Sequence, residues 1–185
     1  MRTHPFTWVP INIHKKVFII LLITTIAVMV GLQVLDVPLK TEAAPSGIVS
    51  FEFAGSQEKA KQILHSWSSA ARISAGLSLG LDYLFLLAYA GAIGLGCVLA
   101  AHKLSQKQYV LASVGVPVAW GQLGAALLDA VENYGLIQEL LGAETELWPI
   151  VTFWCAISKF TIVAVGLAYI IVSACLIAIV RPRSS

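Results

Sequence analysis

Four long apolar stretches constrain the fold of this 185-residue chain more than any other feature. Each can cross the hydrocarbon core of a membrane, about 30 Å thick, which takes about 20 helical residues. The stretches are 17–37, 73–101, 109–141 and 148–180. Backbone polar groups in lipid must be hydrogen-bonded internally, so we expect each stretch to be an α-helix. The chain is therefore predicted to be all-α, a single polytopic membrane domain built as a four-helix bundle.

The composition supports a membrane protein. Hydrophobic residues make up 58% of the chain and charged residues 12%, with a mean hydropathy of +0.82. A soluble domain carries about 25% charged residues, so these values exclude a soluble enzyme and a disordered chain. The net charge of +2 gives no basis for a nucleic-acid partner. The three cysteines lie within apolar stretches without a C-x-x-C pair, which is typical of small buried side chains.

The first apolar stretch, 17–37, could be mistaken for a secretory signal peptide. Its apolar run is longer than the ~7–15 residues of a signal core, and Thr41-Glu42-Ala43 is a poor cleavage site. We therefore expect it to remain in the protein as a signal-anchor helix.

Basic residues near the ends of the stretches predict the orientation, because cytoplasmic loops of membrane proteins are enriched in lysine and arginine. One side carries Arg2, Lys15, Lys16, Lys103, Lys107, Arg181 and Arg183. The other side has Lys40, Lys59, Lys61 and Arg72, spread over the segment 38–72. We therefore expect a multi-pass protein of the cell membrane (a cytoplasmic or inner membrane), with both termini in the cytoplasm and 38–72 outside.

The external segment 38–72 has local structure of its own. The alternation of Ile48 to Phe53 predicts a short strand, and Ser56 is a suitable N-cap for an amphipathic helix. The amphipathic stretch 57–72 is predicted either as a separate helix on the membrane surface or over the bundle, or as an extension of the second membrane helix. We also expect any protein partner to bind through residues 45–72.

The later helices exceed the thickness of a bilayer. The stretches 109–141 and 148–180 are each 33 residues long, or about 50 Å at ~1.5 Å per residue. Tilt absorbs only part of this excess, so helices two to four are predicted to project on the extracytoplasmic side. Pro117 is expected to kink the third helix, and Gly142 to end it.

Ionisable side chains form one layer across the predicted helices. Asp36, Asp82, Asp129 and Lys159 lie 19 to 21 residues from the cytoplasmic ends of their stretches. They should therefore lie at the same level, about 30 Å from the cytoplasmic ends of the helices, at the outer edge of the hydrocarbon. Charged residues within membrane helices are costly and usually face the protein interior, so this layer is the predicted functional site.

The short connection between the third and fourth helices predicts a contact within this layer. If Leu141 opposes Trp148, Lys159 lies axially between Asp129 and Glu132. Helical spacing then predicts which side chains share a pocket. The expected ligand-binding set is Ser78, Asp82 and Tyr89 on the second helix, Gln122, Asp129, Glu132 and Asn133 on the third, and Thr152 and Lys159 on the fourth.

The acids of this set outnumber its lysine. With Asp82, Asp129 and Glu132 ionised, a bound cation, an amine-bearing ligand or a retained proton would balance the charge. A Lys159–Asp129 pair that only fastens two helices explains the imbalance less well. We expect no cofactor and no metal site; if a metal binds, these three carboxylates would favour Mg²⁺ or Ca²⁺. Candidates for acid–base chemistry are Asp82, Asp129, Glu132, Lys159 and, above the layer, His65.

Three function classes remain open at this stage. The favoured one is a binding site at the outer-leaflet interface for a lipid head group or a small polar or cationic ligand, with or without chemistry on it. The second is a small transporter or channel that uses the acids to carry protons or cations. The third is an assembly or accessory subunit in which the charges fasten the helices. Whether the protein is an enzyme is not decided by the sequence.

Overall fold

The computed structural model describes residues 3–106 and 109–179, and within these ranges every regular element is a helix. Four helical stretches are long and apolar enough to cross a membrane, namely Ile11–Leu39, Ser69–Ser105, Val110–Leu140 and Leu147–Ile179. The predicted all-helical, multi-pass membrane protein is confirmed at this level. Of the residues used to predict the orientation, Arg2, Lys107, Arg181 and Arg183 lie outside the described ranges.

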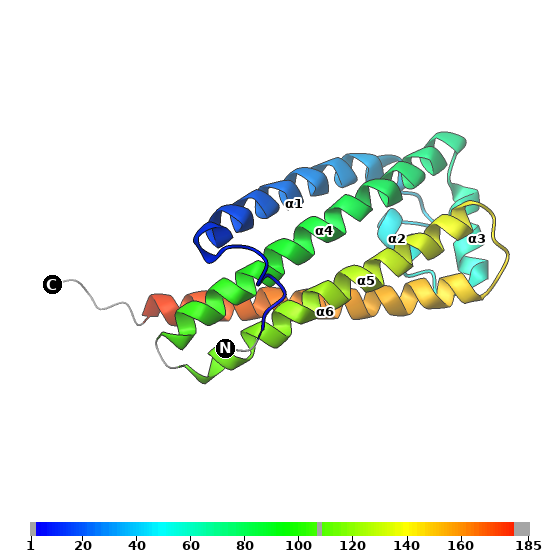
Figure 1. Ribbon diagram of the computed structural model, residues 1–185. Coiled ribbons are helices and arrows are strands. Elements are labelled where there is room, and N and C mark those ends of the chain that lie inside the picture. The colour runs from blue at the N-terminus through cyan, green and yellow to red at the C-terminus, as the bar shows by residue number, and fades with distance from the viewer. Residues whose placement is uncertain (1–2, 107–108, 180–185) are drawn as a thin grey trace.

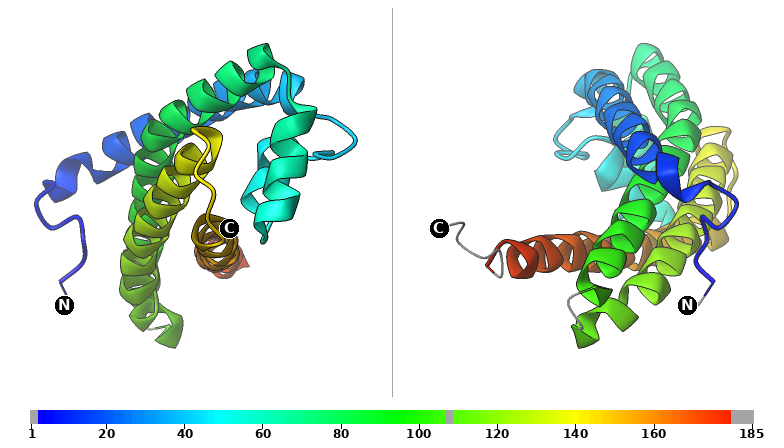
Figure 2. Two further views of the ribbon diagram at one scale, coloured as in Figure 1. Left: turned by 90° about the vertical axis from the view of Figure 1, so that its right-hand side faces the viewer. Right: turned by 60° about the vertical axis from the view of Figure 1, so that its left-hand side comes forward.

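The long helices pack around α4 (Ser69–Ser105), which contacts α1 (His14–Asp36), α5 (Gly115–Leu140) and α6 (Leu147–Ile179). The start of α1 and the ends of α4 and α6 lie at one end of the molecule (Figure 1). The connection between α5 and α6 lies at the opposite end, together with the short helices α2 (Ile48–Glu52) and α3 (Gln57–Ser66). Seen from that end, α1 and α4 lie together on one side, and α6 is separated from α1 (Figure 2).

The amphipathic stretch after Gly55 forms a helix of its own, the first of the two predicted placements. The Ser56 side chain caps α3 by accepting a hydrogen bond of 3.4 Å from the backbone N–H of Lys59. The helix ends at Ser66, and Ser68 caps α4 through the N–H of Ala71. The two serine caps thus separate α3 from the second membrane helix.

The predicted strand at Ile48 to Phe53 is wrong, because this segment contains the helix α2. Gly47 turns the chain with a φ of 59°, and Asp36 Oδ1 accepts a 2.7 Å hydrogen bond from the N–H of Ile48. An acceptor at the first turn satisfies an otherwise unpaired helical N–H. This acceptor lies twelve residues earlier in the chain, so the alternation of side chains within 48–53 does not indicate the helix.

The third membrane stretch is divided just before Pro117, close to where the sequence predicts a kink. A short 3₁₀ helix, Val110–Ser113, precedes α5, and α5 begins only at Gly115. Pro117 therefore lies in the first helical turn, where its missing N–H breaks no helical hydrogen bond. At the other end the prediction holds, because Gly142 adopts a φ of 94° directly after the α5 C-cap.

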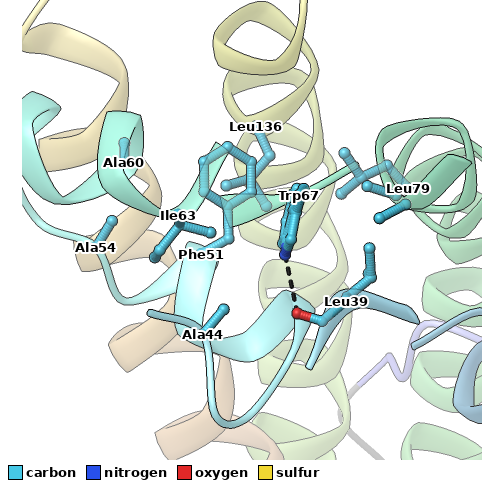
Figure 3. Packing of buried hydrophobic residues seen from close by; sticks show 11 residues of the cluster. Leu39, Ala44, Phe51, Ala54, Ala60, Ile63, Trp67, Leu79 and Leu136 are labelled. Carbon is cyan, nitrogen blue, oxygen red and sulfur yellow. Dashed lines mark hydrogen bonds between the residues drawn. The ribbon is translucent and has the colours of Figure 1, made fainter. Parts of the chain in front are cut away.

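A cluster of buried apolar side chains fastens α2 and α3 to the long helices (Figure 3). Phe51 packs edge-on against Trp67 with 5.3 Å between ring centroids, and the Trp67 indole N–H donates a 2.8 Å hydrogen bond to the carbonyl oxygen of Leu39. Leu79 of α4 and Leu136 of α5 complete the contact. This packing holds α2, and with it Glu52, in place against the ends of the long helices.

Candidate functional site

Lys159 is the centre of the candidate site. Its side chain is buried on α6, and its ammonium Nζ donates hydrogen bonds of 2.6 Å to Asp129 Oδ1 and 2.8 Å to Glu132 Oε1. The short α5–α6 connection fixes the register of the two helices, and Asp129 and Glu132 are one turn apart on α5. The contact that this register predicts from the sequence is therefore present.

A third carboxylate on the lysine was missed by sequence reasoning. Glu52 of α2 is buried, and its Oε2 lies 3.7 Å from Lys159 Nζ. Burial raises the pKa of Glu52 to about 7, opposed by the Lys159 ammonium and supported by the Asp129 and Asp82 carboxylates. An acid placed between Phe51 and Phe53 was the available signal, because an ionisable residue within an apolar segment is a candidate site residue.

Asp82 belongs to the site without contacting the lysine directly. Its Oδ2 accepts a 2.7 Å hydrogen bond from the Asn133 side-chain amide. The Tyr89 hydroxyl, also on α4, donates a 3.0 Å hydrogen bond to Asp129 Oδ2. Asn133 and Tyr89 thus link the acid on α4 to the charged group between α5 and α6.

Two carboxylate oxygens within this group lack a donor. Neither Oε2 of Glu52 nor Oε2 of Glu132 receives a hydrogen bond from an N–H or O–H group of the described residues, although both atoms are buried. The site thus contains four acids, Glu52, Asp82, Asp129 and Glu132, and one ammonium group, that of Lys159.

A cavity of about 490 Å³ opens from this charged group between the helices. Ser78, Asp82, Tyr89, Asp129, Asn133, Lys159, Glu52, Asp36 and Gln33 line its polar end. The remaining lining is almost entirely apolar, and comes mainly from Leu22, Met29 and Leu32 of α1, Phe85, Ala92 and Ile93 of α4, and Phe160, Val163 and Leu167 of α6. The arrangement is thus an acidic end joined to an elongated apolar space.

Two predicted site residues lie away from this cavity. The Gln122 amide donates a 3.1 Å hydrogen bond to the carbonyl oxygen of Ile162, and the Thr152 hydroxyl donates to the carbonyl oxygen of Pro149 at 3.2 Å. Both side chains are buried, and neither lines the cavity. The Gln122 hydrogen bond joins α5 to α6, and the Thr152 hydrogen bond lies within α6.

His65 also lies apart from the lysine. It is exposed on α3 and lines a second, smaller cavity of about 160 Å³ together with Arg72 and Glu139. Glu139, which sequence reasoning did not single out, is buried, and neither of its carboxylate oxygens has a hydrogen-bond partner among the described residues. An acid–base role for His65 on a ligand held at Lys159 has no geometric support.

The described residues contain no group of three or more histidine, cysteine, aspartate or glutamate side chains arranged to hold a metal ion. Lys159 Nζ lies between the carboxylates of Asp129 and Glu132. The contacts that the described side chains make at the site are ion pairs and hydrogen bonds.

Comparison of the chain with models of known protein families, with curated proteins and with solved structures found no match.

Proposed function

We propose that this is an integral membrane protein that binds a lipid or another amphiphile in the 490 Å³ cavity, with the head group at the charged layer around Lys159. The observation that carries the proposal is the form of the cavity, acidic at one end and apolar along the rest. Ligand sites are typically apolar cavities of about 300–1,000 Å³ with a few polar groups that fix the orientation of the ligand.

The placement in the membrane follows from the basic residues. With both termini in the cytoplasm, as Lys15, Lys16 and Lys103 favour, the charged layer lies near the outer-leaflet interface. The parts of α4, α5 and α6 beyond it then project outwards, with α2 and α3 packed on them. In this orientation the head group of an outer-leaflet lipid is at the depth of Asp82 and Lys159.

The access route is lateral. α4 forms the floor of the cavity, α1 and α6 form its sides, and α2 closes the charged end, as the lining residues indicate. α5 contributes Asp129 and Asn133 to the lining. The other described helices supply no lining residues. We infer that the side opposite α4 faces the lipid, from which an amphiphile can enter without crossing water.

Transport across the membrane is less well supported by the lining. A pathway for protons or cations needs polar groups along its whole length. Below the charged layer the cavity is lined by Leu22, Met29 and Ile93, with Thr25 as an isolated hydroxyl. The carboxylates therefore lie at one level, where they can hold a ligand. They do not form a polar pathway towards the cytoplasm.

A cavity-filling variant tests the proposal. Thr25 on α1 and Val163 on α6 are partly buried lining residues, so the double variant Thr25→Trp/Val163→Trp places two large rings in the apolar space. Leu127→Trp is the matched control, because Leu127 is 70% exposed on α5 and does not line the cavity. The probes are dodecanol and dodecylamine carrying a photoreactive diazirine in the chain, added to the full chain in phosphatidylcholine nanodiscs.

We expect photolabelling of the parent and of Leu127→Trp by at least one probe to saturate and to be displaced by the same probe without the diazirine. The filled variant should show only the non-saturable labelling of a lipid-exposed surface. Saturable labelling that persists unchanged in the filled variant, or that is absent from the folded parent with both probes, would overturn the proposal.

A further inference from the structure

The polar end of the cavity carries a large excess of negative groups. Its lining includes the carboxylates of Asp36, Glu52, Asp82 and Asp129, and the single ammonium of Lys159. Lys40 offsets one of these acids, since its Nζ lies 3.6 Å from Asp36 Oδ2. Glu132 adds a further carboxylate directly behind the lining. A ligand that completes this site therefore has to bring positive charge or hydrogen-bond donors.

Unused acceptors face the cavity from two different helices. Oε2 of Glu52, on α2, lies 3.7 Å from Lys159 Nζ but is buried without a hydrogen-bond donor. Asp82, on α4, uses Oδ2 to accept from Asn133, and its Oδ1 receives no hydrogen bond from the described residues. Lys159 donates no hydrogen bond to Asp82, because its hydrogen bonds go to Asp129 and Glu132. A buried acceptor without a donor, such as Oε2 of Glu52, is costly, which favours a donor supplied by a ligand.

The apolar part of the cavity has the length of a lipid chain. On α1 its lining extends from Leu32 to Leu22, ten residue steps, or about 15 Å at ~1.5 Å per residue. On α4 it extends from Phe85 to Ile93, eight residue steps, or about 12 Å. One leaflet contributes about 15 Å to the hydrocarbon core. The apolar part of the cavity thus has about the depth of one leaflet.

We propose that the ligand is a single-chain cationic amphiphile whose ammonium head group lies between Glu52 and Asp82 and whose alkyl chain follows α1 and α4 towards Leu22 and Ile93. This inference rests on the proposed function and deepens it by naming the chemical class of the ligand. A primary ammonium group offers three donors, enough for the free oxygens of both acids. A phosphate or carboxylate head group would meet like charge, and an alcohol would leave the excess charge in place.

The test compares head groups on one chain length. Photoreactive dodecylamine, dodecanol and dodecyl phosphate are bound to the full chain in phosphatidylcholine nanodiscs, and saturable labelling is measured against concentration in the membrane. Labelling of the filled variant Thr25→Trp/Val163→Trp is subtracted for each probe, because the three probes partition differently into lipid.

We expect half-maximal labelling by the amine at a concentration at least about tenfold below that of the alcohol, as for a charge-assisted hydrogen bond. The phosphate should give no saturable labelling. Asp82→Asn keeps the size of the side chain and removes its charge, so it should reduce the preference for the amine by about tenfold. Glu144→Gln, an exposed acid that pairs with Lys61 and lies outside this cavity, should leave the preference unchanged.

The outcomes separate this inference from the proposed function. Equal saturable labelling by the amine and the alcohol, or a preference that Asp82→Asn leaves intact, would overturn the cationic amphiphile while the binding function stands. A preference for the phosphate would overturn it as well and point to an anionic lipid. Absence of saturable labelling by all three probes would overturn both proposals.

Discussion

Lys159 Nζ lies 2.6 Å from Asp129 Oδ1, and this hydrogen bond joins two long apolar helices through a buried pair of charges. Glu132 and Glu52 share the same ammonium from α5 and α2. Three elements of the chain, α2, α5 and α6, therefore meet at one side chain. The remaining acid, Asp82, is attached through Asn133.

Removal of the ammonium should destabilise the protein strongly. Lys159→Met leaves three carboxylates without their cation, and breaking a buried ion pair costs about 3–5 kcal/mol. The double variant Lys159→Met/Asp129→Leu should lose less, because one of the stranded charges is removed with its partner. The measurement is the midpoint of thermal unfolding of the reconstituted protein.

An exposed ion pair supplies the control for this comparison. Lys61 pairs with Glu144 at 3.2 Å on the surface, so Lys61→Met should change the free energy of unfolding by about 0–1 kcal/mol. If Lys159→Met is as stable as Lys61→Met, the buried pair does not contribute to the fold.

Glu52 should make stability fall as the pH rises. Burial raises its pKa from the ordinary value of 4.5 to about 7, in surroundings that hold Lys159, Asp129, Asp82 and Glu132. Between these two values the folded state binds more protons than the unfolded state, so the free energy of unfolding decreases as the pH rises through this window. Glu52→Gln removes this contribution and should flatten the pH dependence of the unfolding midpoint between about pH 4.5 and 7.

The comparison variant for pH is Glu42→Gln, an exposed acid in the connection before α2. It should keep the slope of the parent. A parent and a Glu52→Gln variant with the same slope would mean that Glu52 titrates like an exposed carboxyl group.

The turn before α2 depends on glycine. Gly47 has a φ of 59°, and a Cβ at this position would collide with the Asp36 carboxylate that caps α2. Gly47→Ala should therefore cost about 1–3 kcal/mol, the range for strained backbone conformations. Gly124→Ala on α5, where a Cβ would meet nothing within 4 Å, should be neutral or slightly stabilising. Equal stability of the two variants, measured by thermal unfolding, would contradict the requirement for glycine at position 47.

The packing of α2 and α3 depends on one indole. Trp67→Phe keeps an aromatic ring against Phe51 but removes the N–H that the carbonyl oxygen of Leu39 accepts. A buried acceptor left without its donor costs about 1–3 kcal/mol. Trp8→Phe, at an indole that is 79% exposed, should cost less than 0.5 kcal/mol, as is usual at the surface (about ±0.5 kcal/mol). Hydrogen exchange of α2 and α3 should rise in Trp67→Phe alone.

The sequence predicts best what local and short-range constraints determine. The four membrane helices follow from apolar runs, and the contact of Lys159 with Asp129 and Glu132 follows from the register of a short hairpin. Asp82 was placed in the right layer, but its partner is Asn133, because the rotation of α4 against α5 is not fixed by a tight turn.

The parts that the sequence did not predict depend on distant contacts. The helix α2 is capped by Asp36, and its position against α4 and α5 is set by Phe51, Trp67 and Leu136. Only this packing brings Glu52 to Lys159. The prediction that His65 lies above the site fails for the same reason. The direction of α3 is fixed by its packing against distant residues, which the periodicity of the helix does not indicate.

The most direct test of the central claim is the position of the label. Photoreactive dodecylamine bound to the parent at saturation should modify peptides of α1 and α6 that line the cavity, around Met29 and Val163, and Thr25→Trp/Val163→Trp should abolish these modifications. Labels distributed evenly over lipid-facing residues such as Leu127 and Val131, in the parent as in the filled variant, would contradict a binding cavity.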